Sequence, residues 1–206
     1  MTINWNRYRA RYDAMTYAEV AAFHRVIWES YPEQAQHSTE HLAAFFSGLV
    51  SPSVVELGGW RGEAAGTMLA RFPGIVLWDN YEICEPAARK PVTPDPRYHG
   101  IFPDRWPWEL PTSRYDTAVL SHVIEHVRAR QLRELADWLH RCGVEHLYVE
   151  APLEDAARTW GSYEGAHVLE LGMPEVVDLL SEYGFVVQSR AWHEPESHVL
   201  FLGAAA

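Results

Sequence analysis

Hydrophobic residues along the chain follow two periodicities that alternate for most of its length. Apolar residues at three- and four-residue steps predict amphipathic helices over residues 17–31, 38–49, 64–71, 82–89, 129–142 and 175–183. Short, nearly continuous apolar runs predict buried strands at 54–57, 75–78, 98–102, 117–120, 144–149, 184–187 and 198–202. Strands alternate with helices until the last two, which we expect to pair as a hairpin. This order predicts an α/β fold with a mostly parallel sheet, helices on both faces and one antiparallel strand.

The first strand run leads into a glycine-bearing loop that predicts a ligand site. The loop lies in the stretch Val54-Val55-Glu56-Leu57-Gly58-Gly59-Trp60-Arg61-Gly62. Its apolar run ends at the carboxylate Glu56, the glycine-bearing loop comes next, and a predicted helix follows the loop. Glycines let the backbone approach a ligand and adopt φ values that side chains disfavour. The spacing is Glu-x-Gly-x-x-x-Gly, which differs from the dinucleotide pattern Gly-x-Gly-x-x-Gly, and no P-loop Gly-Lys-Ser/Thr follows. A carboxylate ahead of the loop would repel a pyrophosphate, so it favours a nucleotide-like ligand with a cationic end.

A later segment carries a more specific pattern. Tyr115-Asp116-Thr117-Ala118-Val119-Leu120-Ser121-His122-Val123-Ile124-Glu125-His126-Val127 places an aromatic-Asp pair, a four-residue strand and a Glu-His pair in one register. It resembles the fourth strand and its exit in the class I methyltransferases. The loop also resembles motif I of that family, with Glu56, Gly58 and Gly62 in place and Trp60 where the middle glycine is expected.

The resemblance extends over roughly residues 54–203 and implies a seven-stranded sheet of order 3-2-1-4-5-7-6. The family's cofactor, S-adenosylmethionine, has a sulfonium and an ammonium but no phosphate, which agrees with the carboxylate before the loop. The loop residues implied to bind it are Glu56, Gly58, Gly59, Trp60 and Gly62. The Trp60 ring could also meet a cation through its π face.

Further residues are implied to bind the cofactor at the ends of later strands. Asp79, with Asn80, follows the loop by about 20 positions, where such folds hold ribose hydroxyls; capping of the next helix is its alternative role. Asp104, past the third strand, is placed to accept the adenine amino group, and Trp106 and Trp108 to stack on adenine or line a substrate pocket. For these three residues, packing in the core or anchoring of the loop is the alternative.

Three histidines are candidate catalytic groups, and Ser121 and His122 are expected beside the sulfonium. His122 could remove the acceptor's proton, since imidazole titrates near neutrality, or contact the cofactor through its backbone alone. His126 belongs to the Glu-His pattern, whose residues more often shape the site than take part in the chemistry. His167 is expected in the pocket wall, with an exposed loop position as the alternative.

Residues 122–126 also spell His-x-x-Glu-His, the inverted zinc-protease signature. That signature requires both histidines on one turn of a helix, whereas here it follows directly on a buried strand. The position where metal-dependent catechol methyltransferases carry an acidic ligand holds Ser121-His122. We therefore expect no metal site.

The composition of the chain limits the kinds of partner and the location that we expect for the protein. The chain has 206 residues, 48% of them hydrophobic, and a net charge of −11, which disfavours a nucleic-acid partner. No apolar run approaches a membrane span, the N-terminus lacks the apolar core of a signal peptide, and Cys84 and Cys142 make no disulfide framework, so a cytoplasmic protein is expected. We expect residues 1–50 to form a helical lid and residues 51–206 the methyltransferase domain.

The sequence therefore predicts an S-adenosylmethionine-dependent methyltransferase acting on oxygen, nitrogen or carbon of a small molecule. The alternative is a regulatory module that keeps the fold and has little or no transferase activity. Two features count toward this alternative: the altered motif I and the lack of a clear catalytic base.

Overall fold

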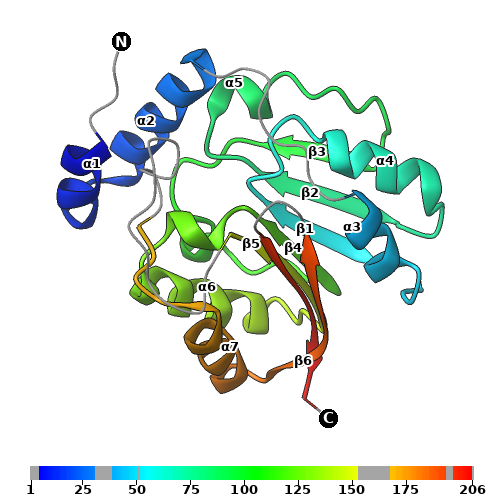
Figure 1. The fold of residues 1–206 in the computed structure, drawn as a ribbon. Helices are drawn as coiled ribbons and strands as arrows, with labels where there is room; N and C mark the ends of the chain where they lie inside the picture. The colour runs from blue at the N-terminus through cyan, green and yellow to red at the C-terminus, as the bar shows by residue number, and fades with distance from the viewer. Residues whose placement is uncertain (1–4, 31–38, 51, 153–167, 194–196, 206) are drawn as a thin grey trace.

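A single sheet of seven strands organises the molecule (Figure 1). The computed structural model describes residues 5–30, 39–50, 52–152, 168–193 and 197–205. The strand order is β3-β2-β1-β4-β5-β7-β6, and all neighbours are parallel except the β5–β7 and β6–β7 pairs. The strands are β1 (Ser53–Leu57), β2 (Leu77–Tyr81), β3 (Tyr98–Ile101), β4 (Thr117–Ser121), β5 (His146–Ala151), β6 (Phe185–His193) and β7 (Ser197–Ala204). The predicted fold class and sheet order are confirmed, with β7 as the antiparallel strand.

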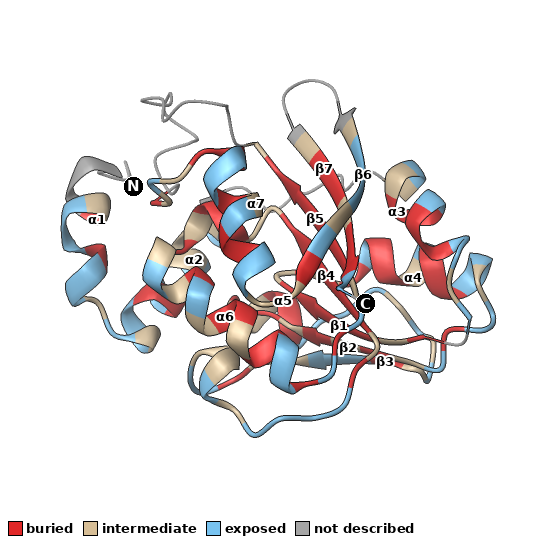
Figure 2. Ribbon diagram, turned by 90° about the horizontal axis from the view of Figure 1, so that it is seen from below, coloured by how far each residue is buried: buried red, intermediate tan, exposed pale blue. Residues whose placement is uncertain are grey.

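Helices cover both faces of the sheet because its strands are apolar on both sides. Val54 faces α3 and α4, whereas the next residue, Val55, faces α6 and α7, as the two-residue period of a strand requires. Figure 2 shows the resulting buried layers on either side of the strands. The helices are α1 (Trp5–Arg11), η1 (Tyr12–Ala14), α2 (Tyr17–Ser30), α3 (Thr39–Phe46), α4 (Glu63–Arg71), α5 (Glu85–Ala88), η2 (Pro107–Glu109), η3 (Ile124–His126), α6 (Ala129–Arg141) and α7 (Met173–Glu182).

Two of the strands whose bounds differ from the sequence-based expectation affect the site. The second strand was expected at residues 75–78 but runs Leu77–Tyr81, where it pairs in register with all of β1. The polar pair Asp79-Asn80 interrupts the apolar run, yet both residues have hydrogen-bond partners inside the sheet, so the strand continues through them. The fifth strand begins and ends two residues later than expected, which places Glu150 inside it.

The N-terminal helices divide between two cores. Helix α3 packs with α4 against the sheet. By contrast, α1, which was not predicted, η1 and α2 share a small core with Ile83, Trp106 and Val168, which follow strands β2, β3 and β5 in the chain. We call α1, η1 and α2 the cap. The lid function of residues 1–50 stays a prediction. Among the described helices, none has the length and apolar character needed to cross a bilayer.

Candidate active site

Buried carboxyl groups gather where the central strands end. Strands β2, β1, β4 and β5 are consecutive neighbours and parallel, so their carboxyl ends lie along one edge. Four glutamates lie on these strands or within four residues of their ends, and each is at most 3% exposed: Glu56, Glu82, Glu125 and Glu150. Burying acidic groups is costly unless hydrogen bonds or cations compensate. The edge therefore suits a ligand that carries positive charge.

The loop after β1 depends on glycine at two positions. Gly58 has φ 68° and Gly62 has φ 82°, both in the left-handed region that glycine tolerates best. A Cβ atom on Gly58 would lie 2.9 Å from Cγ2 of Val123, so the loop and the exit of β4 approach closely. Gly62 is the N-cap residue of α4. The predicted turn from strand to helix is thus present, with both motif glycines where the backbone needs them.

Two polar side chains of the second strand region hold this loop. Asn80 accepts a hydrogen bond from the Gly59 N–H (3.0 Å) and donates one to the Trp60 carbonyl (3.1 Å). Glu82 accepts one from the Trp60 N–H (2.9 Å). Trp60 itself has φ 53°, a conformation that costs a non-glycine residue roughly 1–2 kcal/mol. Because both of its backbone polar groups are bonded, the surrounding side chains impose this strained conformation.

The structure separates Asp79 from the loop. Asp79 is the middle residue of β2 and points to the opposite face of the sheet from Asn80. There its two carboxyl oxygens bind the Tyr115 hydroxyl (2.7 Å) and His99 Nδ1 (2.8 Å). The expectation that Asp79 lies at the end of its strand is wrong, because the strand runs on to Tyr81. Its predicted ribose contact is not tested, but its oxygens already have partners on the α6 side.

Glu82 is the acidic residue that does follow the end of β2, and sequence reasoning missed it. Its oxygens accept hydrogen bonds from the Trp60 N–H and from the Cys84 N–H (2.7 Å). Burial raises its pKa to about 7, although these backbone hydrogen bonds lower it. The residue was interpreted as the start of a helix; the signal that could have found it is its place one residue after the true strand end.

Glu56 lies beneath the loop. One carboxyl oxygen accepts a hydrogen bond from Trp78 Nε1 (2.8 Å), and the other, Oε1, has no partner among the described residues. Burial raises the pKa of Glu56 to about 8, against the lowering effect of the Trp78 bond. A Cβ on Gly59 would collide with this carboxyl group, which explains the second loop glycine. A cation nearby would favour the ionised form.

The residues expected to contact adenine lie in the segment after β3. The Asp104 side chain is 74% exposed and pairs with Arg105 (2.8 Å). Trp106 and Trp108 stack on each other, with ring centroids 4.9 Å apart. Trp106 belongs to the core of the cap, whereas Trp108 packs against the α6 core. The adenine contacts predicted for these three residues stay predictions.

A second group of side chains lies at the ends of β4 and β5. His122 follows β4 with φ 54°, and its N–H donates to the Glu150 carbonyl (2.7 Å). Its ring faces two buried carboxylates, with Nδ1 3.4 Å from Glu125 Oε1 and Nε2 3.9 Å from Glu150 Oε1. Ser121 and Tyr148 donate hydrogen bonds to the other oxygen of Glu150 (3.0 Å each). Burial lowers the pKa of His122, but the Glu125 hydrogen bond and the two negative charges outweigh it, and the pKa is raised.

His126 connects this group to the cap. The Tyr12 hydroxyl donates to the His126 carbonyl (2.8 Å), and the rings of His24 and His126 meet edge to face at 5.8 Å. Burial and the charge of His126 lower the pKa of His24 to about 3, so His24 is neutral. His167 lies outside the described residues.

The His-x-x-Glu-His segment at residues 122–126 does not form the helical site that the zinc-protease signature requires. Ser121 ends a strand, and the following η3 spans only Ile124–His126, so His122 is not on a helix with His126. Within the described ranges, no cluster of three or more His, Cys, Asp or Glu residues could hold a metal ion.

Comparison with known proteins bears on the fold. No family model matches the chain, and no curated protein matches it. Among solved structures, it is similar to the mitomycin 7-O-methyltransferase MmcR (18% identity, TM-score 0.63, 81% of this chain and 53% of that one). It is also similar to the magnesium protoporphyrin IX methyltransferase ChlM of Synechocystis PCC 6803 with bound SAH (13%, 0.65, 89% and 94%). The N-methyltransferase NodS of Bradyrhizobium japonicum WM9 is a third (15%, 0.63, 82% and 94%).

The chain has the fold of these methyltransferases. It spans about half the length of the first of them, MmcR, and matches nearly the whole of ChlM and NodS. Identities of 13–18% establish architecture, so ligand and reaction have to be argued from the site.

Proposed function

We propose that the protein is an S-adenosylmethionine-dependent methyltransferase acting on a small molecule. The observation that carries this proposal is the loop of residues 58–62, clamped by Asn80 and Glu82 above the buried Glu56. The loop brings backbone close to a ligand, and the carboxyl groups around it favour a cationic ligand over a phosphate.

Within this proposal, Glu82 takes the ribose position first expected of Asp79. Its carboxyl group follows the end of β2, beside the loop, and each oxygen has accepted one hydrogen bond while retaining capacity for another. Glu56 fits the cationic end, because its Oε1 is buried and has no partner among the described residues.

The chemical step requires little from the protein beyond positioning, because the sulfonium of the cofactor supplies an already activated methyl group. His122 would accept the acceptor's proton at Nε2, with Glu125 orienting the ring through Nδ1. A carboxylate behind an imidazole stabilises the imidazolium that proton uptake creates. The helices of the cap would exclude water from the reacting groups.

The acceptor is proposed to be a small molecule rather than nucleic acid, since the chain carries a net charge of −11. MmcR, ChlM and NodS are named for O-, porphyrin and N-methylation respectively, so the shared architecture serves several acceptor atoms. The alternative is a module that binds the cofactor without transferring its methyl group.

Calorimetry tests the proposal directly. After treatment with a chelator, the protein should bind S-adenosylhomocysteine and S-adenosylmethionine without added metal. Folded protein that gives no heat at high micromolar ligand would contradict the proposal. A subsequent screen of hydroxyl, amine and carbon acceptors for methylated product separates the enzyme from the binding module.

A further inference from the structure

The hydroxyl of Tyr17, the first residue of α2, is buried and has no hydrogen-bond partner among the described residues. Leaving such a group unpaired costs roughly 1–3 kcal/mol, and native structures rarely do so without a reason. The backbone of α2 does not require tyrosine here. The hydroxyl is therefore a buried polar group for which the described residues supply no hydrogen-bond partner.

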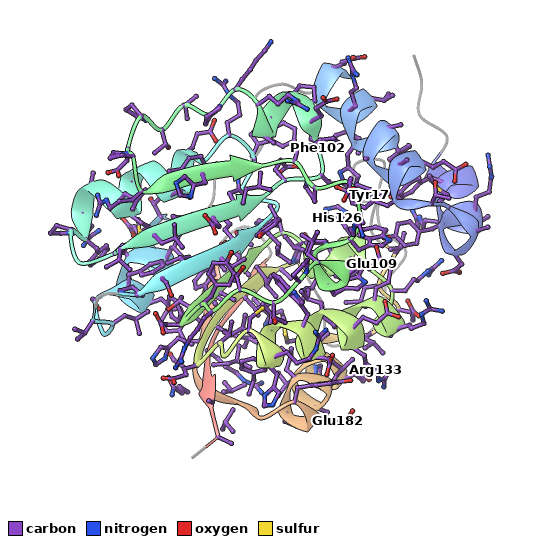
Figure 3. The ribbon with its side chains drawn as sticks, turned by 180° about the vertical axis from the view of Figure 1, so that it is seen from behind. Tyr17, Phe102, Glu109, His126, Arg133 and Glu182 are labelled. Atoms are coloured by element: carbon purple, nitrogen blue, oxygen red, sulfur yellow. The ribbon has the colours of Figure 1, made fainter. Side chains whose placement is uncertain are left out.

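The surroundings of Tyr17 place it near the proposed ribose site. Its ring packs edge to face on Trp106, with centroids 5.2 Å apart. Helix α2 packs against α5, which begins three residues after Glu82, and Ile83 lies in the same small core as residues of α2. Figure 3 shows Tyr17 at the side of the molecule where the strands end, in the same region as Phe102 and His126.

Two acidic side chains lie close enough to the Tyr17 hydroxyl to affect its pKa. Burial raises the pKa of Tyr17, and the negative charges of Glu82 and Asp104 raise it further. The phenol therefore stays protonated and remains a donor. Glu82 in its ionised form can only accept hydrogen bonds, so the two groups offer complementary roles to a ligand hydroxyl placed between them.

We propose that Tyr17 is a cofactor-positioning residue, whose hydroxyl donates a hydrogen bond to a ribose hydroxyl oxygen while Glu82 accepts that hydroxyl's hydrogen. This inference rests on the proposed function and extends it to the cap, where no sequence motif indicates a site. The cap then contributes to binding the nucleoside half of the cofactor as well as covering the acceptor side at His126.

The substitution Tyr17→Phe tests this inference, because it keeps the ring on Trp106 and removes only the hydroxyl. Binding of S-adenosylhomocysteine, measured by calorimetry, should weaken roughly five- to tenfold, as for the loss of one hydrogen bond. The melting temperature without ligand should stay the same or rise, because an unpaired buried hydroxyl has been removed. A purely structural role predicts the opposite for stability and no specific effect on affinity.

Tyr8→Phe is the matched control. The Tyr8 hydroxyl is also buried without a partner among the described residues. Tyr8 lies in the small core that includes Trp106, the ring on which Tyr17 packs, but the charged group near it is Arg128 rather than Glu82. Its affinity for S-adenosylhomocysteine should remain within about twofold of the parent. Equal losses in both variants would mean that packing of the cap matters and not the Tyr17 contact, and would overturn the inference.

Cofactor analogues locate the contact. Analogues of S-adenosylhomocysteine that lack the 2′- or the 3′-hydroxyl should bind parent and Tyr17→Phe equally in at least one case. If the penalty of Tyr17→Phe persists with both analogues, or is absent with the natural ligand, the inference is wrong while the proposed function stands. If the parent itself binds no S-adenosylhomocysteine, the proposed function fails and this inference with it.

Discussion

The two sides of the strand edge are built by different kinds of hydrogen bond. On one side, residues 58–62 with Asn80 and Glu82, here called the loop half, use side chains to bind backbone N–H and carbonyl groups. On the other side, Ser121, His122, Glu125 and Glu150, the histidine half, bind mostly side chain to side chain. The loop half thus fixes a backbone shape, whereas the histidine half fixes charges.

This difference indicates a division of function. A rigid backbone shape recognises a ligand by fit, and its loss should weaken binding of substrate and product alike. Titratable groups that lie next to one another change each other's proton affinity. The loss of one should therefore affect the turnover rate and the way in which rate and stability depend on pH. The predictions for Gly58, Glu82 and His122 separate these two outcomes.

The largest expected effect, on affinity and stability together, comes from Gly58→Ala in the loop half. The alanine must adopt φ 68°, and its Cβ would lie 2.9 Å from Val123 Cγ2, so the loop has to move. We expect the affinity for S-adenosylhomocysteine to fall more than about tenfold, together with a loss of stability of roughly 1–2 kcal/mol from the left-handed backbone alone. Because of the left-handed φ and the Val123 contact, a bulky residue at Gly58 should disturb the fold as well as the approach of a ligand.

Gly184→Ala is the control for Gly58→Ala. Gly184 has φ 85°, and a Cβ there would meet nothing within 4 Å, so it carries the backbone cost without the contact. It should lose similar stability and keep full affinity. A Gly58→Ala protein that binds the cofactor as well as the Gly184→Ala protein would show that the loop does not approach the ligand.

The next effect distinguishes Glu82 from Asp79. Glu82→Gln should weaken both S-adenosylmethionine and S-adenosylhomocysteine about 10- to 100-fold, the value of a charge-assisted hydrogen bond, because the ribose is common to both. Asp79→Asn should leave affinity within about threefold and instead lower the melting temperature, since Tyr115 and His99 lose their carboxylate. Titration calorimetry and thermal denaturation of both variants measure this. The reverse ranking would restore the ribose position to Asp79.

In the histidine half, His122→Gln should change the pH dependence of the protein's stability more than its affinity for the cofactor. The pKa of His122 is raised in the folded protein, so its ionic contribution is complete below its ordinary value of 6.5 and is lost as pH rises through the raised value. Deprotonation leaves Glu125 and Glu150 without the charge between them. The parent should therefore be more stable than His122→Gln at pH 6 by about 1 kcal/mol, which is roughly 2–4 °C of melting temperature.

The advantage of the parent should shrink by pH 9, and binding of S-adenosylhomocysteine should change less than about threefold. Melting curves of parent and variant across this pH range give the difference, in which the titrations of Glu56 and Glu82 cancel. A difference that does not change with pH would mean that His122 acts only through its backbone.

The sequence predicted the architecture because buried parallel strands leave a strong signal. Runs such as Val54-Val55 are apolar on both faces, and the helices between them repeat their apolar stripes at helical spacing. The loop half was largely predictable too, since Gly58 and Gly62 are required by backbone conformation. Asp79 was misplaced within its strand because a carboxylate bonded across the sheet looks the same in sequence as one at a strand end.

The contacts made by the cap and by the histidine half could not be predicted in this way. Glu150 lies in a strand and meets Ser121 and His122 only because β5 pairs with β4 in one particular register. Helix packing brings the N-terminal helices over strand ends more than 60 residues away in the chain, so that Tyr12 contacts His126 and Tyr17 is proposed to reach the ribose site. Neither arrangement has a local sequence signature.

The smallest expected effect concerns a feature that both halves share. Each contains a non-glycine residue in the left-handed region, Trp60 and His122, within three residues of the ends of the neighbouring strands β1 and β4. Alanine normally stabilises a chain relative to glycine by roughly 0.5–1 kcal/mol, but a left-handed position costs alanine about 1–2 kcal/mol. Trp60→Gly should therefore be more stable than Trp60→Ala by about 0.5–1 kcal/mol, and His122→Gly than His122→Ala likewise. Because each pair loses the same side chain, denaturant unfolding of the two members isolates the backbone strain. If alanine proves the more stable at Trp60 alone, the loop relaxes when the indole is removed, and only the histidine half holds its strained backbone independently of the side chain.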